Sequence, residues 1–211
     1  MFIVKNRVAF FILSTILIVG SFVVISRYGL NYGIDFKGGS ILEVTYVDME
    51  GSKTPALEEV KTILSSTGLL NTLVSPRGDK GYVIKMRELS SEEKNGLIRA
   101  LTNNGQNPVT VDKFNAIGPV VGNELRQKAI VAIAVVLVCI ILFILFAFRK
   151  VRNPLNYGIA TIVALAHDVI IPTGLYVIWS HYTGAEIDLL FVSALLAILG
   201  YSVHDTIVVF D

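Results

Sequence analysis

Two pairs of adjacent ionisable residues stand inside long apolar segments of this sequence. They are His167 with Asp168 and, nearer the end of the chain, His204 with Asp205. Such groups are costly to bury in a membrane-spanning helix, so they usually face a helix bundle or a wet cavity and mark proton or ion pathways. We therefore take all four as candidates for proton coupling. A polar clamp between helices is the alternative, and it is the preferred interpretation for His167 and Asp168 but not for Asp205.

Two other chemistries are possible in principle for polar residues in the apolar segments. A zinc site built from the same four residues would lack the HExxH spacing that fixes ligand geometry, so we expect no metal. An intramembrane hydrolase would need a nucleophile, and neither Ser193 nor Ser202 stands in a Gly-x-Ser-x-Gly setting. We therefore expect a protein that is not an enzyme and that uses no cofactor.

The composition predicts a polytopic α-helical membrane protein. Hydrophobic residues make up 53% of the chain and charged residues 17%, against about 25% charged in ordinary soluble domains. Long runs without acidic or basic residues match the helix length that crosses about 30 Å of hydrocarbon at about 1.5 Å per residue. We predict four spans, at residues 8–26, 129–148, 155–179 and 187–210, with a kink at Pro172 in the third. The first is expected to be a retained anchor and not a cleaved signal peptide, because its apolar core is long and Arg27 follows it.

Basic residues gather on one side of these predicted spans. They precede the first span and fill the loop between the second and third, whereas the loop at residues 180–188 has none. Because basic loops stay in the cytoplasm, we expect the N-terminus inside and residues 27–128 outside. The basic residues are Lys5, Arg7, Arg149, Lys150 and Arg152.

Residues 27–128 are predicted to form an external α+β domain, while residues 1–26 and 129–211 form the membrane part. The order of elements predicts a ferredoxin-like βαββαβ sheet with both helices on one face. Its 13 Lys and Arg balance 12 Asp and Glu, so we expect no nucleic-acid partner. The first helix should be capped at Thr54, with Pro55 at its first position and Gly68 after its end. A Ser90/Glu93 capping box should open the second helix, which ends at 104–105. The expected strands are 40–47, 73–75, 81–87 and 109–114, with a turn at 76–79.

Two glycine-bearing segments connect this domain to the spans. Residues 33–39 (GIDFKGG) leave the first span, and residues 118–125 (GPVVGNEL) return the chain to the second. Glycine permits positive φ or a close backbone approach, so we interpret both as covered hinges, with contact to a substrate as the alternative. The residues singled out are Gly33, Asp35, Phe36, Gly38, Gly39, Gly118, Pro119 and Gly122.

Four motifs together resemble the SecF branch of the SecD/SecF protein-export family. They are the two glycine-bearing segments, His-Asp-Val at 167–169 and GYSVHDTIVVFD at 200–211. The resemblance covers the whole chain in order. It implies an RND-like, six-span subunit of the bacterial cytoplasmic (inner) membrane that uses the proton-motive force to help export preproteins. It also implies SecD and the SecYEG channel as partners, with YajC as a further candidate.

The resemblance also exposes departures from the family pattern. Related chains continue past the position of Asp211 into two more spans, so we expect this sequence to be truncated after the fourth. His204 stands where the family often has Asn, so its imidazole beside Asp205 either alters the coupling or replaces a hydrogen bond. The resemblance makes Asp205 the protonatable residue and leaves His167 and Asp168 without a settled role. Helix rise counted from the flanks puts the two carboxylates about 10 Å apart in depth, so we expect no shared-proton pair.

Overall fold

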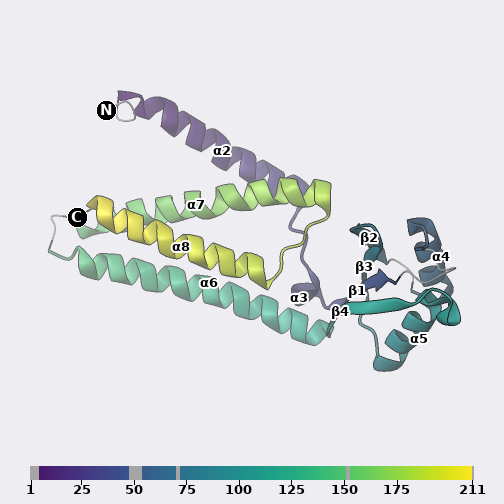
Figure 1. Ribbon diagram of the computed structural model, residues 1–211. Coiled ribbons are helices and arrows are strands. Elements are labelled where there is room, and N and C mark those ends of the chain that lie inside the picture. The colour runs from purple at the N-terminus through teal and green to yellow at the C-terminus, as the bar shows by residue number, and fades with distance from the viewer. Residues whose placement is uncertain (1–4, 48–53, 70–71, 151–152, 211) are drawn as a thin grey trace. The chain divides into compact units, whose positions relative to one another are not determined.

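The computed structural model describes residues 5–47, 54–69, 72–150 and 153–210. Within these residues the chain forms two compact units. One is the α+β unit Gly33–Arg126, and the other is the helical unit made from the described parts of Met1–Tyr32 and Gln127–Asp211. Figure 1 shows the helices and strands of each.

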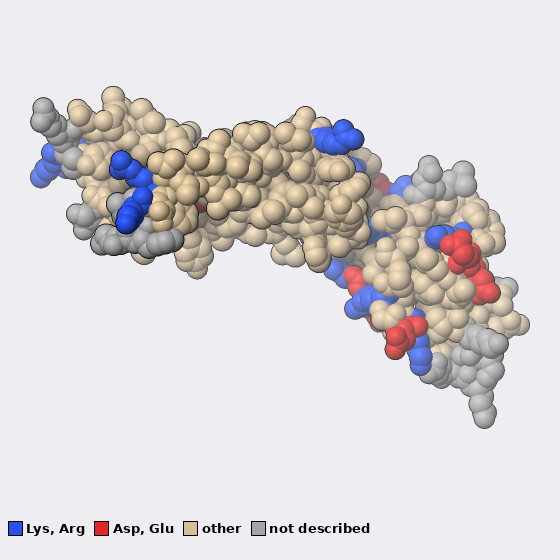
Figure 2. Space-filling view, turned by 90° about the horizontal axis from the view of Figure 1, so that it is seen from above, with Lys and Arg blue, Asp and Glu red and all other residues tan. Residues whose placement is uncertain are grey.

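Four helices are long and apolar enough to cross a membrane, as the sequence predicted. They are α2 (Arg7–Tyr28), α6 (Pro119–Ala147), α7 (Pro154–Thr183) and α8 (Leu189–Phe210). Helix α6 begins ten residues before the predicted span, because Pro119 suits the first helical position and no further proline interrupts the helix. Helix α7 continues through Pro172 as one helix. Figure 2 shows a broad surface without charged side chains along these helices.

The helical unit packs around two sets of contacts. Helix α2 lies along α7, where Ser21 is buried. Helices α6, α7 and α8 share a core that includes Ile144, Leu165 and Leu199. At one end of these three helices, the rings of Phe148 and Tyr157 stack with centroids 5.2 Å apart, and Phe210 meets both edge-on. Arg152 of the predicted basic loop and Asp211 of the C-terminal motif lie outside the described residues.

The α+β unit has the predicted βαββαβ order and a ferredoxin-like sheet. The sheet order is β2-β3-β1-β4, and every neighbouring pair is antiparallel. Alternate residues of the strands, such as Leu42 and Ile84, are fully buried against Val60 and Leu97 of the two helices. The elements are α3 (Ile34–Lys37), β1 (Gly39–Tyr46), α4 (Leu57–Ser66), β2 (Leu73–Arg77), β3 (Gly81–Met86), α5 (Ser91–Leu101), η1 (Asn103–Gly105) and β4 (Val109–Ile117).

The local predictions for α4 and α5 had mixed outcomes. The Ser90 hydroxyl accepts from the Glu93 amide at 3.1 Å, so the predicted capping box of α5 is confirmed. The predicted cap of α4 at Thr54 is wrong, because Ala56 is the N-cap residue. The Glu59 carboxylate accepts from the Ala56 amide, which starts the helix there, and Pro55 stays outside it.

The predicted turn at residues 76–79 begins too early. Pro76 and Arg77 belong to β2 and pair with Tyr82 and Gly81. A proline is tolerated there because β2 is an edge strand of the sheet, where a missing N–H need not break a ladder. Gly68, with φ of 78°, follows the end of α4 as predicted.

Candidate functional site

The two glycine-bearing segments pack directly against each other in the α+β unit. Helix α3 ends where the Gly38 amide donates to the Ile34 carbonyl at 2.8 Å, with Gly38 at φ 76°. A Cβ added at Gly38 would lie 2.7 Å from Pro119 Cα, and one added at Gly122 would lie 2.7 Å from Gly38 N. Only hydrogen atoms fit in these gaps. We call residues 33–39 and 118–122, packed in this way, the glycine clasp.

The other residues of the first segment anchor the clasp to the sheet. Phe36 is buried, and Asp35 is half-buried. Gly33 and Gly39 are buried, and a Cβ added at Gly39 would lie 2.7 Å from the Met86 carbonyl oxygen. Ser40, which is fully buried, then accepts from the Leu89 amide at 3.0 Å. The clasp therefore continues without a break into β1.

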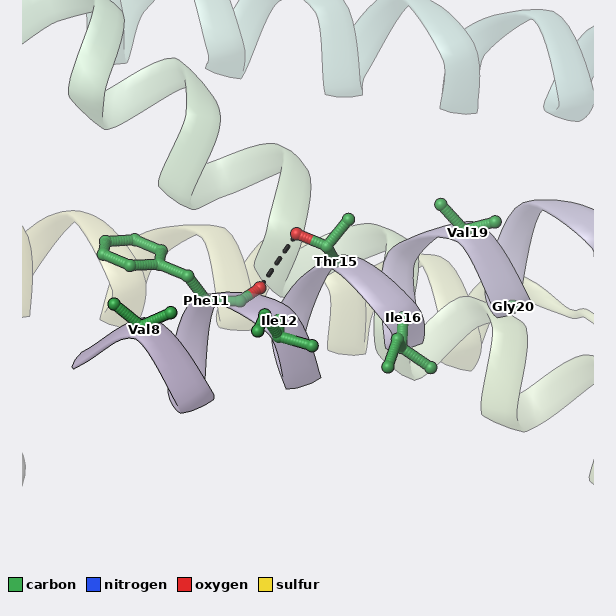
Figure 3. Close-up of a pocket in the computed structure, with 7 residues that line it drawn as sticks. All are labelled: Val8, Phe11, Ile12, Thr15, Ile16, Val19 and Gly20. Carbon is green, nitrogen blue, oxygen red and sulfur yellow. Dashed lines mark hydrogen bonds between the residues drawn. The ribbon is translucent and has the colours of Figure 1, made fainter. Parts of the chain in front are cut away.

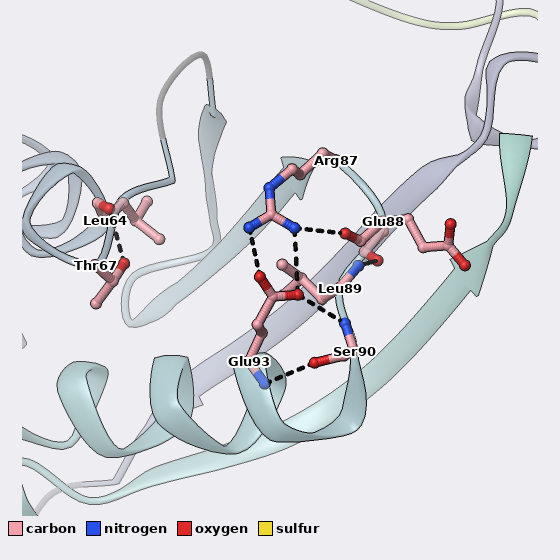
Figure 4. Close-up of polar contacts among 8 residues, drawn as sticks. Leu64, Thr67, Arg87, Glu88, Leu89, Ser90 and Glu93 are labelled. Atoms are coloured by element: carbon pink, nitrogen blue, oxygen red, sulfur yellow. Dashed lines mark hydrogen bonds and ion pairs between the residues drawn. The ribbon is translucent and has the colours of Figure 1, made fainter.

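A charged network lies beside the clasp, where β3 passes into α5 (Figure 4). The Arg87 guanidinium donates to the Glu93 carboxylate at 2.5 Å and to the Glu88 carbonyl at 2.9 Å. The hydrogen bond from Arg87, with a second from the Ser90 amide, lowers the pKa of Glu93 to about 2. The Glu88 carboxylate lies 3.3 Å from where a Cβ at Gly118 would be. The capping box indicated Glu93 in the sequence, but no pattern indicated its pairing with Arg87.

Each intramembrane His–Asp pair is formed by neighbours on one helix. His167 Nδ1 lies 2.7 Å from Asp168 Oδ1, and each side chain is 37% exposed. His204 Nδ1 lies 3.6 Å from Asp205 Oδ1, and the exposed fractions are 76% and 85%. These contacts do not join two helices, so they give no direct support to the clamp interpretation. The α8 pair instead faces away from the other described helices.

The cavity between α6, α7 and α8 has no polar side chain among the described residues of its lining that could pass a proton to or from the two His–Asp pairs. It measures about 200 Å³ and is lined by apolar side chains, among them Leu137, Ala166 and Leu199. Among the described residues no group of three or more His, Cys, Asp or Glu is placed to hold a metal ion. The expected depth difference between Asp168 and Asp205 stays a prediction.

Sequence reasoning missed the close contact of two helices at Ser21 and Gly174. A Cβ added at Gly174 would overlap the Ser21 side chain and lie 2.7 Å from Ser21 Cα. Small residues at such positions let membrane helices approach closely. The sequence offered one indication of this contact, which is that both residues are small and lie within predicted spans.

Comparison with known protein families gives two matches. The family described as "Protein export membrane protein SecD/SecF, C-terminal" matches residues 97–211, more than half of the chain. The "SecD/SecF GG Motif" matches residues 23–47, which include the first half of the glycine clasp.

Individual relatives agree with these matches. The protein translocase subunit SecF of Thermobaculum terrenum is 38% identical over 99% of this chain and 68% of its own length. SecF of Anaerolinea thermophila is 33% identical over 99% of this chain and 67% of its own. The crystal structure of SecDF, a translocon-associated membrane protein from Thermus thermophilus, superposes with a TM-score of 0.74 at 27% identity, over 95% of this chain and 26% of that chain. The chain therefore belongs to the SecD/SecF family of protein-export membrane proteins.

Proposed function

We propose that this chain acts as the SecF-type subunit of a bacterial protein translocase, pairs with SecD and uses the proton-motive force to promote export of preproteins. The single observation that carries the coupling role is the position of Asp205. Its side chain is 85% exposed on a helix that is otherwise apolar enough to span the membrane. Because a carboxylate facing lipid is costly, a further helix must cover this face. The relatives named SecF and the likeness to SecDF support SecD as the source of such a helix.

The proposed mechanism uses the change of charge on Asp205. Protonated, the carboxyl is neutral and can hydrogen-bond a neighbouring hydroxyl. Ionised, it needs a cation or several donors from the covering helix, because the surroundings are apolar. Loading a proton from the outer side and releasing it to the cytoplasm would then alternate the contacts between α8 and its partner. His204 and the His167–Asp168 pair are further candidates for this proton path, and SecYEG, YajC and the preprotein are the wider partners.

The test is Asp205→Asn in the protein assembled with SecD. Asparagine keeps the shape of the side chain but cannot titrate. We expect at least a tenfold loss of proton-dependent export in inverted membrane vesicles, with assembly and ATP-driven early translocation unchanged. Ser193→Ala is the control, because Ser193 is exposed on the same helix and bonds only to the Leu189 carbonyl in the contacts described. Normal export by Asp205→Asn, or failure through lost assembly, would make Asp205 a structural residue.

The proposed orientation places the N-terminus in the cytoplasm and the α+β unit outside. Its support is the distribution of basic residues, of which Lys5, Arg7, Arg149 and Lys150 are described. In a Cys139→Ala background, cysteine at the exposed position Ser65 should react with an impermeant maleimide in intact spheroplasts. Cysteine at the exposed Asn153 should react only after the membrane is opened. The reverse pattern would overturn the orientation.

A further inference from the structure

An exposed face of α2 carries an apolar groove of about 650 Å³ (Figure 3). Two rows of side chains form its edges, and within each row the residues are spaced by four, so they stand one above the other on the helix. Figure 3 shows one row rising to one side of the helix and the other row on the opposite side of the groove. The first row is Val8, Ile12, Ile16 and Gly20, and the second is Phe11, Thr15 and Val19.

The groove is suited to an apolar occupant. Its one polar side chain is Thr15, whose hydroxyl donates to the Phe11 carbonyl at 2.8 Å. That hydrogen bond satisfies the hydroxyl within the helix, so an occupant need not supply a polar partner. At the far end, a Cβ added at Gly20 would have no atom within 4 Å, so the groove is open there.

Positive charge stands at one end of the groove. On α2, Arg7 precedes Phe11 by four residues and so lies at the head of the second row, while Lys5 lies two residues before the helix begins. Both side chains belong to exposed residues. At the other end, Arg27 is the next basic residue and lies seven positions beyond Gly20, about 10 Å along the helix. The groove is therefore apolar along its length and basic at its start.

The length of the groove matches one leaflet of a bilayer. From Val8 to Gly20 there are twelve residue steps, about 18 Å at 1.5 Å per residue, and one leaflet contributes about 15 Å of hydrocarbon. Small residues, Ser21 and Gly174, bring α2 and α7 into close contact elsewhere on this helix. The groove edges are instead mostly β-branched or aromatic, and they leave room for a thin chain.

We propose that this groove binds one acyl chain of an acidic phospholipid, with the headgroup phosphate held by Lys5 and Arg7. The chain would lie between the two rows, and the phosphate would sit where the basic residues meet the membrane surface. Basic residues beside a membrane span are attracted to acidic lipids in this way. This lipid site is independent of proton coupling at Asp205.

The first experiment leaves the basic residues unchanged. A benzoylphenylalanine photocrosslinker replaces Ile12 in the groove, or Ile130 on α6 as the control, since their exposed fractions are similar at 56% and 60%. The protein assembled with SecD is placed in vesicles of equal phosphatidylglycerol and phosphatidylcholine, and adducts are identified by mass spectrometry. We expect the phosphatidylglycerol share at Ile12 to exceed that at Ile130 severalfold. Equal shares, or a protein chain captured at Ile12, would overturn the proposal.

Two variants then separate the headgroup from the acyl chain. Lys5→Gln with Arg7→Gln should bring the phosphatidylglycerol share at Ile12 down to the share at Ile130, because each basic residue near the membrane surface contributes about 1 kcal/mol of attraction to acidic lipid. Lys5→Arg with Arg7→Lys keeps both charges and should retain the preference, which controls for disturbed insertion. Gly20→Leu should fill the open end and lower lipid adducts of both kinds at Ile12. An undiminished preference after neutralisation in correctly inserted protein would also contradict the site.

Discussion

Gly174 of α7 lies directly against Ser21 of α2, so close that a Cβ on Gly174 would stand 2.7 Å from Ser21 Cα. A side chain at Gly174 cannot be accommodated by rotating a neighbour, because the obstacle includes backbone. We expect Gly174→Val to force α2 and α7 apart and to cost about 1–3 kcal/mol of stability. The melting temperature of the detergent-solubilised protein measures this cost.

Gly20→Ala provides the matched control for that substitution. Gly20 precedes Ser21 on α2, but a Cβ there meets no atom within 4 Å. We expect its melting temperature to stay level or rise slightly, since alanine favours the helix. If both variants melt like the unchanged protein, the close contact of α2 and α7 does not stabilise the helical unit.

Substitutions in the glycine clasp can separate two energetic costs of adding a side chain, which are steric clash and backbone strain at positive φ. Gly38→Ala adds a Cβ 2.7 Å from Pro119 Cα and also strains the backbone at φ 76°. Gly68→Ala carries the same strain at φ 78° but has open space around it. Gly122→Ala, in the first turn of α6, adds a clash with Gly38 N without a positive φ. We expect Gly38→Ala to lose the most stability, by roughly the sum of the other two losses.

Urea unfolding of a segment spanning residues 33–126 measures these three losses. The segment has its own core around Leu42, Ile84 and Leu97, so we expect it to fold alone with mixed α/β circular dichroism. Strain at Gly68→Ala should cost about 1 kcal/mol, and the clash should add about 1–3 kcal/mol. Equal losses for Gly38→Ala and Gly68→Ala would show that the clasp contact has no energetic weight.

The clasp also shows how far sequence reasoning reached. Glycines at 38 and 122 indicated positive φ or close approach, and Gly38 has the positive φ. What the sequence did not show is that these two glycines approach each other, since they are 84 positions apart and only the folded sheet brings them together. For the same reason the Ser21–Gly174 contact was missed. The spans and the βαββαβ order were predictable because hydropathy and capping are local properties.

Errors at the ends of elements arose where a tertiary contact competes with a local preference. Thr54 and Pro55 form a favourable helix start by residue type, yet the Pro55 carbonyl accepts from the Tyr82 hydroxyl at 2.6 Å. That contact holds the segment against β3, and the helix begins after Ala56. Likewise Pro76 suits a turn, but pairing with Tyr82 keeps it in β2.

The Arg87–Glu93 pair predicts a defined pH dependence of stability. The pKa of Glu93 falls from 4.5 to about 2, chiefly because Arg87 donates to the carboxylate. A lowered pKa in the folded state means that ionised Glu93 stabilises the fold above about pH 4.5, and that this contribution is lost as the pH falls through about 2. Glu93→Gln should therefore destabilise the 33–126 segment at neutral pH and have little effect near pH 2.

Glu92→Gln is the matched control for the pH experiment. Glu92 stands beside Glu93 in the first turn of α5, so both interact with the helix dipole. We expect the Glu92 variant to lose less stability at neutral pH than the Glu93 variant, and Arg87→Met to reproduce the loss and its pH dependence. Urea midpoints over the acid range give the comparison. A loss for Glu93→Gln that is the same at every pH would show that the carboxylate charge is not its cause.

The last prediction separates Asp168 from Asp205. Asp168 has a partner on its own helix, because His167 Nδ1 lies 2.7 Å away, and it is less exposed than Asp205. Asp168→Asn keeps an oxygen that can accept from His167, so we expect assembly with SecD to survive and export to fall less than for Asp205→Asn. Asp168→Leu removes that acceptor, so we expect its melting temperature to fall below that of Asp168→Asn. Export rates and melting temperatures of the three variants, measured on the same preparations, test both statements. If Asp168→Asn abolishes proton-dependent export as completely as Asp205→Asn while the complex stays assembled, then Asp168 also carries the proton and the coupling cannot be assigned to Asp205 alone.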